Sequence, residues 1–291
     1  MNSLGSCRVW CVGEASVSPN ILSFFSQFIE KEAGILFHDI NLYQLQSRLE
    51  EVVRLEKLKD LDELYAVFKR GASTAQIDRL IDQATNNETL FFRDPGFFDA
   101  FKRFVVDEIL PTGPSELRFW SAAASTGQEA ISMAIALDEL SRTRPLPPVK
   151  ILATDICHRA LDKARKGTYS DFEIGRGLSD ERRDRYFKKT AEGWRVSPSI
   201  SAQISFAHNN LIHSTVQDQF HVIFCRNVLI YQKVEMKAQV VRMLLSQLAP
   251  GGGIILGVGE TLMGVSSEVE SRIMDKVVVY TARGTRVRQA A

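Results

Sequence analysis

The sequence lacks the features that mark several large classes of protein. Only four of its 291 residues are cysteine, and it contains neither a C-x-x-C nor an H-E-x-x-H spacing. These absences argue against a zinc site and against a disulfide framework, so we expect no metal. Cys7 and Cys11 are four residues apart and could face each other, but two free thiols in a reducing compartment are the favoured interpretation.

An excess of charge of one sign and long apolar runs are also missing. The formal net charge is +1, which provides no bulk attraction to nucleic acid or to anionic membranes. No apolar run approaches the length of a membrane span, and Arg8, Gly13 and Glu14 interrupt the region where a signal peptide would have its apolar core. We therefore expect a cytoplasmic protein with no nucleic-acid partner and no membrane insertion. Nothing indicates its oligomeric state.

The chain also lacks the G-x-G-x-x-G spacing that holds a pyrophosphate, and this disfavours a nicotinamide-dependent oxidoreductase. In its place, an apolar stretch over residues 117–120 runs into SAAASTGQE at 121–129 and then into a helical pattern. Residues with almost no side chain at a strand-to-helix turn let a nucleotide-like ligand approach the backbone amides. Tight packing is the alternative explanation for this turn taken alone.

Three further polar clusters accompany this turn. Asp155 ends a second apolar strand, 149–155, where a carboxylate can accept the hydroxyls of a ribose, although an N-cap for a helix over 156–166 is the usual role of such a residue. Strand 220–225 leads into Arg226, Asn227 and Tyr231 at the expected ligand-binding edge of a sheet. Segment 86–95 holds Arg93 beside two phenylalanines, and taken alone it fits ordinary core packing with a solvated arginine.

The periodicity of the chain divides it into two parts. Residues 20–85 show a helical period without strand-like alternation, and residues 48–70 balance six basic against six acidic side chains, which argues against a basic docking face. From residue 117 onward, strands alternate with helices, as in a parallel sheet covered on both faces. We expect a helix over 234–248 that stops at Pro250-Gly-Gly-Gly253, a strand over 254–258, and an antiparallel edge strand over 276–282. In the polar stretch 167–205, only 194–196 looks strand-like.

Four ordered motifs carry a family resemblance that covers the chain from about residue 20 to about residue 283. The motifs Asn87-x-Thr89-x-x-Phe92-Arg93, SAAASTGQE (121–129), Ala153-Thr-Asp155-Ile and Phe224-Cys-Arg-Asn-Val-Leu-Ile-Tyr231 closely resemble those of the CheR-type chemotaxis receptor methyltransferases. One departure is Glu129-Ala-Ile-Ser, where the family commonly has Glu-Pro-Tyr-Ser. We expect this to change packing only, because Ala and Ile keep the helix face apolar.

The resemblance implies an α/β fold of the class I S-adenosylmethionine-dependent methyltransferase type, with a Rossmann-like doubly wound sheet. It further implies an N-terminal all-helical domain at 19–88, a methyltransferase domain at 89–283 and a small antiparallel β-subdomain inserted at 167–205. In some members that subdomain docks a short peptide from the receptor's carboxyl terminus. Because the turn at 189–194 looks short here, we expect this protein not to depend on that tether.

The resemblance also implies a reaction and a site. The reaction is methylation of glutamate side chains on the cytoplasmic domain of chemoreceptors, with S-adenosylmethionine converted to S-adenosylhomocysteine. The alternatives are the same chemistry in a chemosensory pathway that does not control motility, and a non-catalytic cofactor-binding module. Arg93 and Tyr231 would flank the methyl-transfer point. The residues expected around the cofactor are Asn87, Thr89, Arg93, Ala123, Gly127, Glu129, Asp155, Asn210, Leu211, Arg226 and Asn227.

Overall fold

The computed structural model describes residues 19–37 and 42–284, so the cysteines at positions 7 and 11 lie outside the described residues. The first part of the chain is helical, as the periodicity predicts. It comprises α1 (Pro19–Ala33), α2 (Leu42–Glu56), α3 (Leu61–Gly71) and α4 (Thr74–Ala84). Apolar side chains from all four helices form one core. Local signals set the helix starts: the Asp60 carboxylate caps α3, and Ser73 and Gln76 form a capping box on α4.

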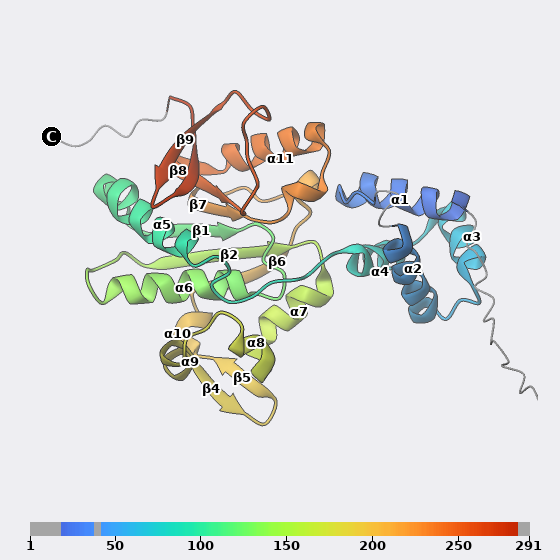
Figure 1. Cartoon of the computed structure of the whole chain (residues 1–291), viewed down its shortest axis with the longest axis horizontal. Helices are drawn as coiled ribbons and strands as arrows, with labels where there is room; N and C mark the ends of the chain where they lie inside the picture. The colour runs from blue at the N-terminus through green and yellow to red at the C-terminus, as the bar shows by residue number, and fades with distance from the viewer. Residues whose placement is uncertain (1–18, 38–41, 285–291) are drawn as a thin grey trace, which may run out of the picture.

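The second part is built on a seven-stranded sheet (Figure 1). Its order is β6-β2-β1-β7-β8-β10-β9, and every pairing among β6, β2, β1, β7 and β8 is parallel. The strands are β1 (Leu117–Ser121), β2 (Val149–Asp155), β6 (Ile204–His208), β7 (Phe220–Cys225), β8 (Leu248–Leu256), β9 (Val269–Met274) and β10 (Val277–Ala282). This sheet, together with the helical domain, confirms the expected α/β methyltransferase fold class.

Both faces of the sheet are buried, so alternate residues of one strand enter different cores. Phe119 packs with α5 (Gly96–Phe104) and α6 (Gln128–Ser141), whereas its neighbour Trp120 packs with α11 (Val234–Ser246) on the opposite face. Near-continuous apolar strands are what such a doubly covered sheet requires. A π-helical turn, η2 (Val105–Ile109), and a short 3-10 helix, η3 (Leu110–Thr112), connect α5 to β1.

A second sheet occupies the polar stretch. It has the order β3-β5-β4, all antiparallel, with strands β3 (Thr168–Tyr169), β4 (Phe187–Thr190) and β5 (Gly193–Val196). The sequence pattern revealed only part of β5, because β3 has two residues and the Lys188 and Lys189 side chains of β4 are exposed. The accompanying helices are α7 (His158–Lys166), α8 (Asp171–Gly175), α9 (Asp180–Tyr186) and α10 (Pro198–Ser201).

Two predictions about the end of the chain are wrong. Helix α11 ends at Ser246, and β8 begins at Leu248 and runs through the Pro-Gly-Gly-Gly stretch, which is therefore part of a strand and not a helix stop. A Cβ at Gly253 would lie 2.5 Å from Val279 Cγ1 on β10 and 3.0 Å from Phe104 Cζ on α5, so close packing requires glycine within the strand. Strand β10 pairs antiparallel as predicted, but it is not the edge, because β9 pairs with its other side.

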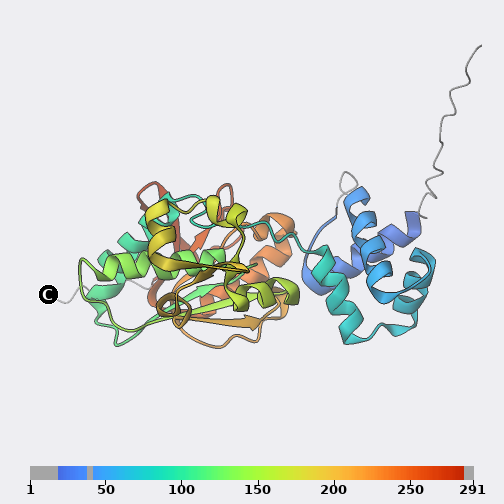
Figure 2. The same ribbon diagram turned by 90° about the horizontal axis from the view of Figure 1, so that it is seen from below.

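The helical domain lies beside the sheet domain, at the end where the parallel strands finish (Figures 1 and 2). Hydrogen bonds that link the two include those from Asn210 Nδ2 to the Glu32 carbonyl at 2.6 Å, and from the amides of His158 and Arg159 to the Asp82 carboxylate at 2.8 and 3.3 Å. Across residues 19–37 and 42–284, no helix combines the length and apolar character needed to cross a membrane.

Candidate active site

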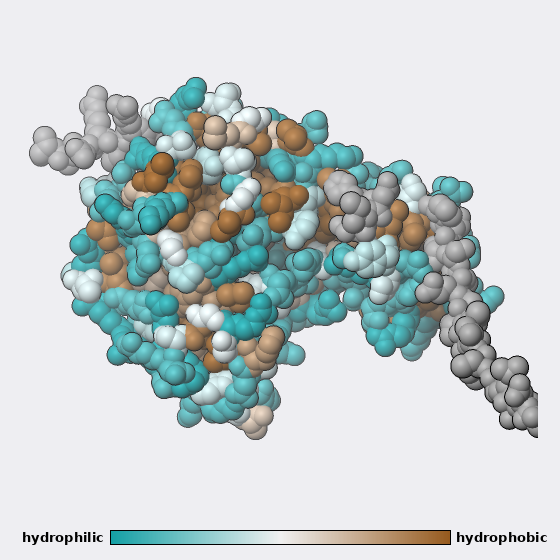
Figure 3. All heavy atoms as spheres, viewed as in Figure 1, coloured by the Kyte–Doolittle hydropathy of each residue, from teal (hydrophilic) through white to brown (hydrophobic). Residues whose placement is uncertain are grey.

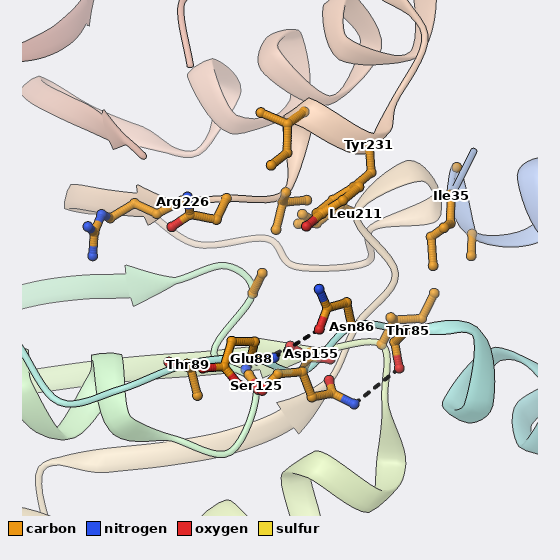
Figure 4. Close-up of a pocket in the computed structure, with 18 of the residues that line it drawn as sticks. Ile35, Thr85, Asn86, Glu88, Thr89, Ser125, Asp155, Leu211, Arg226 and Tyr231 are labelled. Atoms are coloured by element: carbon orange, nitrogen blue, oxygen red, sulfur yellow. Dashed lines mark hydrogen bonds between the residues drawn. The ribbon is translucent and has the colours of Figure 1, made fainter. Parts of the chain in front are cut away.

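A cavity of about 280 Å³ lies between the carboxyl ends of the strands and the helical domain. In Figure 4, Arg226, Leu211 and Tyr231 lie on one side and face Thr89, Ser125 and Asp155 across the gap, while Ile35 and Thr85 lie toward the helical domain. Both domains therefore contribute to its wall.

The structure brings together nearly all of the site residues predicted from the sequence. Gly127 does not line the cavity, but the others do: Asn87, Thr89, Arg93, Ala123, Glu129, Asp155, Asn210, Leu211, Arg226, Asn227 and Tyr231. Gly127 precedes α6 with φ +95°, and a Cβ there would lie 3.0 Å from both Ala164 Cβ and the Tyr169 hydroxyl. Glycine is required at position 127 because the turn has a positive φ and because neighbouring side chains pack closely against it.

Asp155 forms the floor of the cavity beside the small-residue turn. Its Oδ2 accepts the Ser125 amide at 2.8 Å, and its Oδ1 accepts the Cys157 amide at 2.9 Å. Burial raises the pKa of this carboxyl, and the backbone hydrogen bonds act against that shift. Each carboxylate oxygen has more than one acceptor position, so Asp155 keeps capacity for ligand hydroxyls. Asp155 does not cap α7, because the first free amides of that helix, those of His158 and Arg159, bond to Asp82 of α4.

The segment that carries Arg93 has an unusual backbone. Phe92 and Asp94 both have positive φ, 47° and 57°, which side-chain-bearing residues rarely adopt. The Phe92 amide donates to Ser132 Oγ at 2.9 Å, and the Arg182 guanidinium lies 3.8 Å from the centre of the Phe92 ring. These contacts fix a backbone that turns Arg93 into the cavity.

Arg226 holds several parts of the site together. Its side chain is 1% exposed, and its Nη2 donates to Asp94 Oδ2 at 2.7 Å and to the Arg93 carbonyl at 2.9 Å. Its Nη1 donates to Glu129 Oε2 at 3.3 Å, and Glu129 Oε1 accepts Ser121 Oγ at 2.8 Å. Burial raises the pKa of Glu129, while the charge of Arg226 opposes that shift.

Glu260 supports the site from outside the cavity lining, and no sequence motif predicted this role. Its Oε2 accepts the amides of Asn227 and Gly257, both at 2.7 Å, and its Oε1 accepts those of Val228 at 3.0 Å and Ile230 at 3.2 Å. One carboxylate thus holds Asn227 in a left-handed conformation, φ 59°, and shapes the loop that leads into η5 (Leu229–Tyr231). A single Glu in a glycine-rich loop provides no motif that would reveal this role.

The helical domain supplies a further part of the wall that no motif indicated. Residues 33–37, Gln44 and Arg48 line the cavity, and the Leu36 amide bonds to the Tyr231 carbonyl at 3.1 Å. The Arg48 guanidinium stacks 5.5 Å from the Phe37 ring centre, and burial lowers its pKa. The balance of basic and acidic side chains over residues 48–70 gives no indication that Arg48 lines the cavity.

Three buried polar atoms of residues that line the cavity have no partner among the described residues. They are the donors Asn209 Nδ2 and Arg226 Nε and the acceptor Gln232 Oε1, in residues that are 5%, 5% and 8% exposed. Leaving such atoms unsatisfied costs about 1–3 kcal/mol each, so they favour a ligand with both donors and acceptors. Together with Asp155 for ribose hydroxyls and Leu211 as an apolar surface, they fit the nucleoside part of S-adenosylmethionine.

The fold and this cavity define an S-adenosylmethionine-dependent methyltransferase. The family model described as "CheR methyltransferase, all-alpha domain" matches residues 21–85, and the one described as "CheR methyltransferase, SAM binding domain" matches residues 87–278. The chain therefore belongs to the CheR methyltransferase family, and its cofactor is S-adenosylmethionine.

Curated relatives match over most of their length. A chemotaxis protein methyltransferase of Vibrio parahaemolyticus is 36% identical, with 88% of this chain and 94% of the relative covered. Chemotaxis protein methyltransferase Cher2 of Pseudomonas putida and chemotaxis protein methyltransferase 1 of Pseudomonas aeruginosa are each 35% identical, with 89% of this chain and 96% of the relative covered. Both domains are thus shared with the relatives.

Proposed function

We propose that this protein methylates glutamate side chains on the cytoplasmic domain of chemoreceptors, and so acts in the cytoplasm. The product would be a glutamate methyl ester, with S-adenosylhomocysteine released. The relatives' names, chemotaxis protein methyltransferases, support a chemoreceptor substrate. The observation that carries the proposal is the position of Arg93, which lines the same cavity as Asp155 and Thr89.

The chemistry requires little proton transfer from the protein. A glutamate carboxyl has an unperturbed pKa of about 4.3 and is ionised at neutral pH, so no general base is needed. When bound, S-adenosylmethionine would supply the methyl group. The carboxylate oxygen would form a bond to the methyl carbon as the carbon–sulfur bond breaks, and the sulfur would keep the electron pair. Alignment of the acceptor therefore provides most of the rate enhancement that the chain itself contributes.

Arg93 would orient the acceptor carboxylate. Its Nη1 makes a 3.3 Å hydrogen bond to the Glu88 carbonyl, and no other hydrogen bond or ion pair is formed by its guanidinium within the described residues. The remaining donors of the planar fork can hold two carboxylate oxygens. Tyr231 lies across the cavity from Thr89 and Asp155 (Figure 4), with 40% of its surface exposed, and would contact the same incoming group.

The test is a methylation assay with labelled cofactor. The protein is incubated with tritiated S-adenosylmethionine and receptor cytoplasmic fragments, and alkali-labile label in the fragments is counted. Arg93→Ala is expected to lower turnover at least about 100-fold while S-adenosylhomocysteine binding persists in part. Arg165→Ala serves as the control, because Arg165 is a half-exposed arginine paired with Asp162 on α7. Full activity of Arg93→Ala would remove Arg93 from the mechanism, and label that resists alkali would exclude an ester product.

A further inference from the structure

An apolar surface borders the mouth of the cavity on the side of the sheet domain. Its exposed side chains are those of Ile230, Tyr231 and Val234 around η5, and Val258 and Met263 in the loop between β8 and β9. Their exposed fractions are 49%, 40%, 58%, 63% and 83%. We call these five residues the mouth surface. Figure 3 shows apolar side chains gathered on this face of the molecule.

The mouth surface is continuous with the cavity. Ile230 and Tyr231 line the cavity and are also exposed, so a macromolecule that inserts a side chain there must cover them. The Glu260 carboxylate joins the second segment to the first, because it bonds to the amides of both Gly257 and Ile230. Val258 therefore lies next to the wall of the active site.

The loop that carries Met263 is anchored from within. Leu262 is fully buried against Ile254 and Tyr280, and its amide bonds to the Tyr280 hydroxyl at 3.4 Å. The Val265 amide closes a turn onto the Leu262 carbonyl at 3.0 Å. A preformed loop that exposes Met263 loses little conformational entropy when a partner covers it, which favours binding.

The charges nearby limit what the partner can be. Residues 228–232 and 257–267 contain one ionisable side chain besides Tyr231, Glu260, and its carboxylate is used by backbone amides. Val234 is flanked by Lys233 and Glu235, and Lys233 is paired with Glu30 of α1. An acidic group can meet Arg93 in the cavity, and the exposed side chains of Ile230, Val258 and Met263 offer apolar contacts. A complementary partner surface carries one carboxylate with apolar neighbours. Residues three and four apart in a helix place such side chains on one face.

From these observations we propose that the mouth surface docks the receptor helix that bears the acceptor glutamate, with apolar residues one turn away lying on Val258 and Met263. This inference rests on the proposed function and adds the surface by which the substrate is recognised. It differs from docking through the helical domain or the β-subdomain because it lies on the η5 segment, which lines the cavity, and on the β8–β9 loop that Glu260 joins to it.

The double variant Val258→Ser/Met263→Ser tests this surface. Both side chains are exposed, so the fold should be retained. We expect the KM for receptor fragments to rise about tenfold with kcat within about twofold, which corresponds to the loss of about 1.4 kcal/mol of binding. S-adenosylhomocysteine binding, measured by calorimetry, should be unchanged. Ile273→Ser is the matched control, since Ile273 is 76% exposed on the edge strand β9.

The outcomes separate the two proposals. A wild-type protein that methylates the fragments, together with a double variant of unchanged KM, overturns the docking surface and leaves the proposed function intact. An equal rise in KM for Ile273→Ser also overturns the docking surface, because the effect would then not be local. A wild-type protein that neither binds nor methylates the fragments overturns both.

Discussion

At the scale of single residues, Arg226 determines how the site is assembled. Its guanidinium is buried and contacts Asp94, Glu129 and the carbonyl of Arg93, so it connects the segment that bears Arg93 to the end of β7. Sequence reasoning placed Arg226 at the cofactor, and it does line the cavity. Its hydrogen-bonding groups nevertheless point mainly to protein partners, which gives it a positioning role as well.

Gln232 provides a prediction about the cofactor. Because its Oε1 is buried without a partner, Gln232→Met should leave the free energy of unfolding unchanged or slightly higher. The same change should weaken S-adenosylhomocysteine binding about tenfold, since the acceptor for the ligand is lost. Denaturant unfolding and calorimetry measure the two effects.

Gln239→Met is the control for Gln232→Met. Its Nε2 donates to the Ile212 carbonyl at 3.0 Å, so its loss should lower stability by up to about 1 kcal/mol without changing ligand affinity. Equal ligand affinity of Gln232→Met and the wild-type protein would contradict a ligand contact at Gln232.

Asp155 provides a prediction about pH. Burial raises its pKa above the ordinary value of 3.8, so it takes up a proton at a higher pH than an exposed aspartate does. Protonation converts an acceptor oxygen into a donor, so S-adenosylhomocysteine affinity should fall as the pH is lowered through the raised pKa. Calorimetry at a series of pH values from neutral downward measures the change.

The direction in which stability changes with pH distinguishes this loss of ligand affinity from unfolding. The folded state binds the Asp155 proton more tightly than the unfolded chain does, so this group makes the free protein more stable, not less, as the pH falls through its raised pKa. Asp155→Asn should bind S-adenosylhomocysteine weakly at every pH, and its affinity should vary less with pH than that of the wild-type protein. Glu129 can contribute to the variation that is left, because burial also raises its pKa. A wild-type affinity that is independent of pH would contradict the role given to Asp155.

At the scale of elements, α7 depends on a residue of the other domain. Its first amides, those of His158 and Arg159, bond to the Asp82 carboxylate on α4. This cap fixes α7, which follows directly after Asp155, against the helical domain. The carboxylate also lies at the N-terminus of the helix, where negative charge is favourable.

Asp82→Ala should lower the free energy of unfolding by about 1–2 kcal/mol, as removal of a helix cap does. Urea unfolding followed by circular dichroism measures the loss. Asp78→Ala is the matched control, because its carboxylate lies 3.8 Å from the His158 imidazole and both groups are substantially exposed. It should cost less than about 0.5 kcal/mol. Equal stabilities of the two variants would show that the cap does not contribute.

At the scale of the whole molecule, the site belongs to both domains. The backbone bond from Leu36 to Tyr231 and the bond from Asn210 to Glu32 cross between them beside the cavity. Residues of α1, α2 and the segment that follows α4 close the side of the cavity away from the sheet. A ligand held there would contact both domains at once.

The β-subdomain carries a prediction about the encounter with the receptor. Strands β4 and β5 pair from Thr190 to Gly193, so only Ala191 and Glu192 form the turn between them. We expect that a peptide from the receptor's carboxyl terminus does not bind at low-micromolar concentration in calorimetry. Receptors with and without that tail should be methylated at equal rates. Low-micromolar binding of the peptide would overturn this prediction.

Much of the architecture follows from local patterns. The helical period of residues 20–85 and the alternation from residue 117 predicted the two kinds of domain, because each element buries a recognisable apolar face. The path of β8 through three glycines could not be predicted in this way. Glycine is needed at position 253 because Val279 and the Phe104 ring, which are distant in sequence, lie close to it.

The sequence by itself determined which residues could meet a nucleoside cofactor, because strand ends of a parallel sheet gather at one edge and the four motifs stand at strand ends or beside them. Only the tertiary structure decided how that site is closed and supported. Glu260, Asp82 and the segment 33–37 act through contacts with residues far away in the chain, and such contacts leave no periodic or compositional signal. The physical reason is that periodicity records burial along one element, whereas a cavity forms where separate elements meet.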